Sequence, residues 1–244
     1  MIQRPNLLKV RDYPINDKIS VHVPTVDEIF EFGDQKYYNM VQSLTSTPFD
    51  LMVELDDIGI DYETITDYQL FILMIQSIAA NEGDTSILFR GLDLRKFRET
   101  EDLRNGEHIL WDEVNDIKID QLIAFEICNA FRKIHFWEAP VGKAGNAEAK
   151  RYLIERNRMK KKRLAKKPYQ SFLENMIISL VNTEEFKYDY ESVLDLSIFK
   201  LNASWRQIQK KKHWEQTMSG AYFGTVDLSK VNLEKISWLS PDLV

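Results

Sequence analysis

The segment from Lys150 to Lys167 constrains the fold most, because it holds ten basic residues and a single acid, Glu155. Its net charge is therefore +9, and since the whole 244-residue chain carries −6, the remainder must carry −15. Residues 50–67 alone contain seven acids and no base. Such segregation favours self-association or a partner bound on the basic segment. The basic residues are Lys150, Arg151, Arg156, Arg158, Lys160, Lys161, Lys162, Arg163, Lys166 and Lys167.

The composition is that of an ordinary folded protein, with 44% hydrophobic and 29% charged residues. No apolar run approaches the roughly 20 residues that span a bilayer, so we expect no membrane segment. The first residues lack the apolar region of a secretory signal. With Cys128 as the single cysteine, no internal disulfide can form, and a reducing, cytoplasmic compartment is expected.

Apolar residues recur at helical spacing through most of the chain. In the helix expected at 48–58, the acids Asp50, Glu54 and Asp57 fall on the face opposite the apolar stripe and are expected to be solvated. Asn146 is expected to cap the basic helix, and Pro168 to begin the apolar helix that follows it. The expected helices are 26–32, 34–46, 48–58, 67–78, 120–137, 146–166, 168–181, 190–194 and 198–218, with a short one within 231–239.

Alternation with a period of two predicts a few strands. One is expected at 18–23. Residues 87–94 and 108–112 also have a β-like pattern, with the hairpin signal Asn105-Gly106 between them, and 117–119 can pair with them. The fold class is therefore mainly α with a small antiparallel β-sheet. We expect two parts, a helical part with the sheet over 1–139 and a helical part with the basic helix over 140–244, or one continuous domain.

No pattern predicts a catalytic or metal site. The four histidines are scattered, and Cys128 and His135, although on one helix face, are about 10 Å apart, too far for one ion. Residues 55–63 lack the alternating oxygen ligands of a calcium loop. Neither a phosphate-binding loop nor a nucleophile elbow occurs. We therefore expect no cofactor, no metal and no enzymatic activity.

The basic helix has three interpretations. It can be a solvated helix beside acidic surface of the same molecule or of a sister subunit. It can bind an acidic protein partner. It can also bind nucleic acid through phosphate contacts, which ranks lower because the rest of the chain is acidic. On the helix at 198–218, Trp214 is either a core residue or an interface anchor.

Six stretches together carry a resemblance to a known group of proteins. The chain resembles proteins encoded in the tail modules of phages and prophages of Gram-positive bacteria over residues 24–240. This resemblance implies a tail assembly chaperone, or else a minor tail or baseplate component of the virion. The stretches are VPTVDEIFEFG, YYNMVQSLTSTPFDLMVELDDIGIDYETITDYQLF, GNAEAKRYLIERNR, KPYQSFLENMIISLVNTEEFKYDYESVLDL, RQIQKKKHWEQTMSGAYFGTVDL and VNLEKISWLSPDL.

The resemblance also implies partners and a location. A tail chaperone would bind another tail protein, such as the tape measure, in the host cytoplasm, whereas a baseplate component would remain in the virion tail. Homo-oligomers are compatible with either role. No family active site exists, so no residue inherits a catalytic role from the resemblance.

Overall fold

The structure is a computed structural model that describes residues 5–81, 83–102 and 106–240. It is mainly helical with two small antiparallel sheets, which confirms the predicted fold class. Contacts divide the chain into two compact units. The first comprises residues up to Pro24 together with Glu28–Gln170, and the second comprises Thr25–Asp27 together with the residues from Ser171 onward. The loop at 140–145, where the sequence predicts a division, lies within the first unit.

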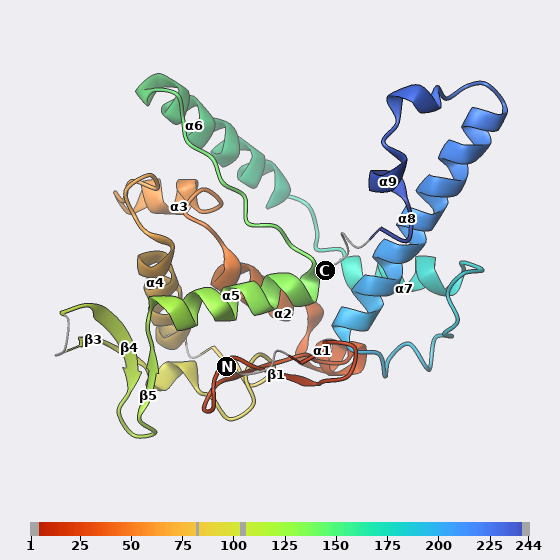
Figure 1. Ribbon diagram of the computed structural model, residues 1–244. Coiled ribbons are helices and arrows are strands. Elements are labelled where there is room, and N and C mark those ends of the chain that lie inside the picture. Colours follow the sequence, from red (N-terminus) through yellow and green to blue (C-terminus); the bar gives the residue numbers. More distant parts are fainter. Residues whose placement is uncertain (1–4, 82, 103–105, 241–244) are drawn as a thin grey trace. The chain divides into compact units, whose positions relative to one another are not determined.

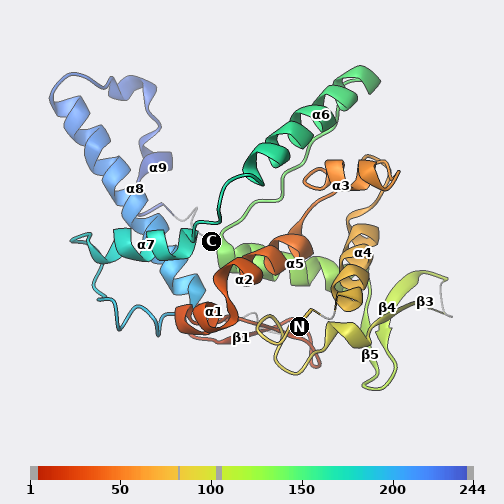
Figure 2. The ribbon, with the colours of Figure 1, turned by 180° about the vertical axis from the view of Figure 1, so that it is seen from behind.

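The first unit contains helices and both sheets (Figures 1 and 2). Helix α1 begins within the short segment that belongs to the second unit and continues into the first. The elements in chain order are β1 (Asp12–Pro14), β2 (Ser20–His22), α1 (Val26–Phe32), α2 (Asp34–Thr45), α3 (Met52–Asp57), α4 (Asp67–Ala80), the 3₁₀ helix η1 (Leu94–Lys96), β3 (Arg98–Glu101), β4 (His108–Asp112), β5 (Ile117–Ile119), α5 (Gln121–His135) and α6 (Ala147–Leu164).

Side-chain caps set the starts of the principal helices. The Thr66 hydroxyl accepts a hydrogen bond from the Gln69 backbone amide at 3.1 Å, and the Thr66 backbone amide donates one to the Gln69 Oε1 atom at 2.9 Å. Asp120 and Asn146 accept from the amides three residues ahead, each at 2.8 Å, and so begin α5 and α6. These contacts satisfy amides that have no partner within the helix, which is why the sequence locates these starts well.

Helices α2, α4 and α5 pack together around the core of the first unit. Tyr37 and Leu44 of α2, Leu70 of α4 and Phe131 of α5 are buried. The rings of Phe131 and Phe89 meet edge to face with centroids 5.6 Å apart. Each helix therefore buries one apolar stripe and leaves its opposite face to solvent.

The three-stranded sheet has the order β3–β4–β5, with both pairs antiparallel. Strands β4 and β5 coincide with the predicted segments 108–112 and 117–119, and β2 falls within 18–23. The strand predicted at 87–94 is wrong: this segment forms turns, and the edge strand β3 begins only at Arg98. Leu88 and Phe89 both donate to the Thr85 carbonyl, and both are buried, so no alternation exists there. Asn105 lies outside the described residues.

The second unit is helical. Its elements are α7 (Phe172–Val181), α8 (Ile198–Tyr222), the 3₁₀ helix η2 (Leu228–Lys230) and α9 (Leu233–Ile236). Phe172 of α7 meets Trp205 of α8 edge to face, with ring centroids 6.1 Å apart. The side-chain amide of Gln207 in α8 donates a 2.6 Å hydrogen bond to the carbonyl of Trp238, which follows α9. In neither unit is any described helix long and apolar enough to cross a membrane.

Three predicted helix bounds in this unit need correction. Helix α7 begins at Phe172 and not at Pro168, because the Ser171 side chain accepts from the Glu174 amide and caps it there. The short helix predicted at 190–194 is a run of turns. Helix α8 continues through Gly220 to Tyr222, since a single glycine weakens a helix by only about 1 kcal/mol and does not end it.

Candidate docking surface on the basic helix

Helix α6 is attached to the first unit by an apolar anchor. Ile154 is only 6% exposed and belongs to a buried cluster with Met52 and Leu55 of α3 and with Tyr62. Leu153 packs against the same cluster. The adjacent residues 153 and 154 thus define the side of α6 that faces α3. An otherwise highly charged helix is held in one orientation because these two side chains are removed from water.

One end of this inner side carries an ion-pair group. The Lys150 ammonium donates to the carboxylates of Asp61 and Glu63, the latter at 3.0 Å, and lies 5.0 Å from the centre of the Tyr62 ring. The hydrogen bond from Lys150 lowers the pKa of Asp61. A hydrogen bond from the Ala144 amide, and then one from Lys150, lower the pKa of Glu63. The pKa of Lys150 is lowered by burial but raised more by these two carboxylates.

Two further cations of α6 reach α3. The Arg158 guanidinium donates to Asp56 and Asp57, each at 2.7 Å, and the Lys161 ammonium donates to Glu54 at 2.6 Å. Glu54 and Asp57 are exposed, as the sequence predicts, but they also form ion pairs with α6, which the sequence does not reveal. Lys150, Arg158 and Lys161 are spaced by eight and three residues, so they recur on one side of a helix with 3.6 residues per turn. Three predicted site residues thus bind acidic surface of the same molecule.

The remaining cations form the outer face of α6 and its C-terminal extension. All seven are exposed, and none has an ion-pair partner within the described part of the chain. Tyr152 and Met159, which are 66% and 63% exposed, lie among them. Together with Arg156 and Arg163 they follow the 152, 156, 159, 163 spacing of a single helix stripe. The seven cations are Arg151, Arg156, Lys160, Lys162, Arg163, Lys166 and Lys167.

The remaining predicted site residue, Trp214, lies on α8 in the second unit and is half-buried. Near it along α8, Lys211 and Lys212 approach the Glu185 carboxylate at 4.0 and 3.7 Å. Basic residues of α8 are thus partly neutralised, as are those of the inner side of α6.

Part of the chain is similar to a known protein family. Residues 165–241 match the family model described as the YomV second domain. This family is of Bacillus prophage type, so the match indicates a phage-related origin. The matched segment begins directly after α6 and covers nearly all of the second unit. No curated protein and no solved structure matches the chain.

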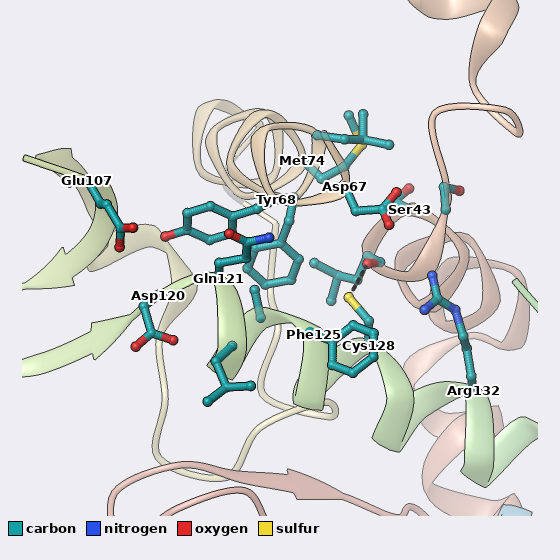
Figure 3. Close-up of a pocket in the computed structure, with 16 residues that line it drawn as sticks. Ser43, Asp67, Tyr68, Met74, Glu107, Asp120, Gln121, Phe125, Cys128 and Arg132 are labelled. Atoms are coloured by element: carbon teal, nitrogen blue, oxygen red, sulfur yellow. Dashed lines mark hydrogen bonds between the residues drawn. The ribbon is translucent and has the colours of Figure 1, made fainter. Parts of the chain in front are cut away.

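A second feature of the first unit is not evident from the sequence: a groove of about 390 Å³ lined by 16 residues, which come from α2, α4, α5 and their flanks and from Glu107 before β4 (Figure 3). We call it the α5 groove. Leu122 and Phe125 of α5 line it and remain 67% and 56% exposed. Glu107 and Asp120 lie at one end in the figure and Arg132 at the other. The sequence signal for this feature is that α5 has more apolar residues than one buried stripe requires, which indicates a second, exposed apolar face.

Cys128 also lines the α5 groove, but its thiol is unsuited to nucleophilic chemistry. It donates a 3.1 Å hydrogen bond to the Leu44 carbonyl, and burial raises the pKa of Cys128 to about 11. The nucleophilic thiolate is therefore scarce at neutral pH. His135 is fully enclosed, with its Nε2 atom 2.9 Å from the Tyr37 hydroxyl, and burial lowers the pKa of His135 to about 3. Thus neither residue offers the state that a thiolate–imidazolium pair requires.

Proposed function

We propose that the chain is a non-enzymatic protein of phage tail morphogenesis, a tail assembly chaperone that holds an acidic segment of another tail protein on the outer face of α6. The phage-related match at residues 165–241 and the whole-chain resemblance to tail-module proteins support the setting. The outer face of α6 is the observation that carries the binding role. Its seven cations are exposed while the inner cations already have partners.

The composition of that face favours a protein partner. Tyr, Met and Arg are enriched in protein–protein interfaces, and Tyr152, Met159, Arg156 and Arg163 share one stripe. A nucleic acid would meet the same cations, but the acidic remainder of the chain would repel its phosphates. An acidic protein segment needs only the α6 stripe and can cover Tyr152 and Met159 with apolar side chains of its own.

The inner contacts prepare α6 for binding. Because Ile154 is buried and Lys150, Arg158 and Lys161 are paired, the helix is fixed before a partner arrives. Binding then costs less conformational entropy than it would if α6 became ordered only when the partner bound. The ion pairs with α3 thus support binding at the outer face by holding α6 in place, although they are not part of that face.

Co-expression with the tape measure protein of the same phage genome, followed by pull-down, tests the proposal. We expect the wild-type chain to retain the tape measure and the variant Arg156→Glu/Arg163→Glu to lose it. A matched control, Lys9→Glu/Lys133→Glu, makes the same change in charge at exposed residues outside α6 and should retain it. Equal retention by both variants, or no retention by the wild type, contradicts the proposal.

Two further measurements separate the competing roles. Mass spectrometry of purified virions should find no stoichiometric copy of the chain, whereas a structural tail or baseplate component would be present. Titration with duplex DNA at low salt should show no binding that depends on Arg156 and Arg163. Binding that weakens steeply with added salt would instead favour the nucleic-acid role, because phosphate contacts release counterions.

A further inference from the structure

The α5 groove has the chemical features of a site for a basic, partly apolar helix. Its floor and edge present Phe71, Met74, Leu122 and Phe125. Figure 3 shows the side chains of Asp120 and Arg132 at opposite ends of the groove. An amphipathic helix binds such a groove through apolar side chains at i, i+3/i+4 and i+7 positions.

The charged residues that line the α5 groove limit which kind of helix can bind there. Asp67, Asp120 and Glu107 line the groove and are exposed. Among the described residues that line it Arg132 is the single cation, and it donates a 2.6 Å hydrogen bond to the Thr45 carbonyl. The rim therefore has an excess of negative charge. An occupant with cations beside its apolar anchors fits this rim, and an acidic one does not.

This chain carries a helix that meets these requirements. On the outer face of α6, Tyr152 and Met159 are seven residues apart, and Arg156 and Arg163 flank them. The α6 of the same copy is held on α3 by its opposite side, through Ile154 and the ion pairs of Arg158. Its outer face is consequently directed away from its own unit and is available to another copy.

We propose that the outer face of α6 of one copy docks into the α5 groove of a second copy, with Tyr152 and Met159 against Phe125 and Leu122 and with the arginines beside Asp67 and Asp120. The proposal rests on the proposed function in one respect, because both use the outer face of α6 as the binding surface. Self-association then regulates that face: it covers Tyr152 and Met159 until an acidic tail protein displaces the neighbouring copy.

Each copy offers one helix and one groove, so a pair of copies joined by one such contact still has a free helix and a free groove. These two surfaces either bind each other, which closes a symmetric dimer, or bind further copies, which gives a ring or a chain. Increasing salt weakens it, because the arginines and carboxylates attract each other at the solvent-exposed rim.

Sedimentation velocity on the full chain tests the contact with two variants. The helix variant is Arg156→Glu/Arg163→Glu, and the groove variant is Leu122→Asp/Phe125→Asp, which changes side chains that are already more than half exposed. We expect the wild-type chain to form dimers or larger species, and each variant alone to be monomeric with a dissociation constant raised at least tenfold. Leu122→Asp alone is a second groove variant, and circular dichroism checks that all retain the helical fold.

Mixing the two variants gives the decisive result. The helix variant keeps an intact groove and the groove variant keeps an intact helix, so the mixture should form a 1:1 heterodimer and nothing larger. A wild-type chain that stays monomeric at its highest soluble concentration overturns the proposal. So does a groove variant that still assembles, or a mixture in which no heterodimer forms although the wild type associates.

The same variants distinguish this inference from the proposed function. The groove variant leaves the outer face of α6 unchanged, so it should lose self-association and still retain the tape measure in pull-down. The helix variant should lose both. If the groove variant assembles normally while the helix variant loses the tape measure, the inference fails and the proposed function stands. If the groove variant is monomeric and no variant or wild type binds the tape measure, the proposed function fails alone.

Discussion

The Arg158 guanidinium lies 2.7 Å from the Asp57 carboxylate, across the contact between α6 and α3. The two residues are 101 positions apart in the chain, and their ion pair joins the basic segment to the acidic one within one molecule. The exposed fraction of Asp57 is 59%, so solvent screens this pair. The burial of Ile154 nearby is therefore expected to contribute more to the attachment of α6 than the ion pairs do.

Replacing Ile154 with alanine tests this ranking. We expect Ile154→Ala to lower the free energy of unfolding of the first unit by about 2–5 kcal/mol, because a buried aliphatic side chain is lost from a packed cluster. Arg158→Met, which keeps an apolar stem, should lower it by less. Urea denaturation monitored by circular dichroism measures both. A larger effect of Arg158→Met would show that the ion pairs dominate.

Gly142 allows the loop before α6 to pass close to Phe49. A Cβ atom at Gly142 would lie 2.5 Å from the Phe49 Cε2 atom. Gly142→Ala should therefore destabilise the first unit by about 1–3 kcal/mol, as overpacking does elsewhere. The matched control is Gly145→Ala, since a Cβ there meets nothing within 4 Å. Thermal melting compares them, and equal melting temperatures would contradict the expected clash.

His135 makes stability depend on pH. Its pKa is about 3 in the folded state, against an ordinary value of 6.5, because burial disfavours the charged ring. The unfolded chain therefore binds more protons between these values, and stability falls as pH falls below about 6.5. Between pH 6.5 and pH 5 the free energy of unfolding should decrease by about 1.5 kcal/mol.

The double variant Tyr37→Phe/His135→Leu supplies the control for this pH dependence. It removes the imidazole without leaving the Tyr37 hydroxyl unpartnered. Denaturation curves at pH 5, 6 and 7 should show a smaller decrease in stability toward pH 5 for the variant than for the wild type. Equal slopes for the two proteins would exclude His135 as the source.

Cys128 should react slowly with thiol reagents. A pKa of about 11, against an ordinary value of 9.0, leaves roughly a hundredfold less thiolate at pH 7.5. Reaction of the native chain with a chromogenic disulfide reagent should be slower by about that factor than reaction of the chain unfolded in guanidinium. Comparable rates in both states would mean that the thiol is more accessible than its hydrogen bond to Leu44 implies.

Local chemistry explains which elements the sequence predicts. Asp120 and Asn146 cap helices through contacts three residues ahead, so α5 and α6 can be located from the sequence alone. Residues 87–94 are apolar enough for a strand but fold into turns, because tertiary packing buries consecutive side chains there.

The candidate surface is predicted in part. Composition shows a basic segment and an acidic one, but not which cations of α6 face α3. Lys161 is paired with Glu54 while Lys160 beside it is exposed, and this difference depends on helix phase and on the anchor at Ile154. The apolar residues of α5 indicate an exposed apolar face but not the α5 groove itself, because Met74 of α4 and Phe125 of α5 line it together and no sequence pattern specifies how those helices pack.

The position at which the family match begins has a consequence for how such a gene can change. It starts at Ala165, directly after α6, and the helices α7 and α8 that follow have their own buried residues. Thr25–Asp27 contribute to that unit through backbone hydrogen bonds from Val26 and Asp27 to the carbonyls of Leu196 and Leu194. Backbone hydrogen bonds can form whichever side chains these positions carry. Recombination near codon 165 would therefore exchange the matched segment, residues 165–241, and leave the sequence of α6 unchanged.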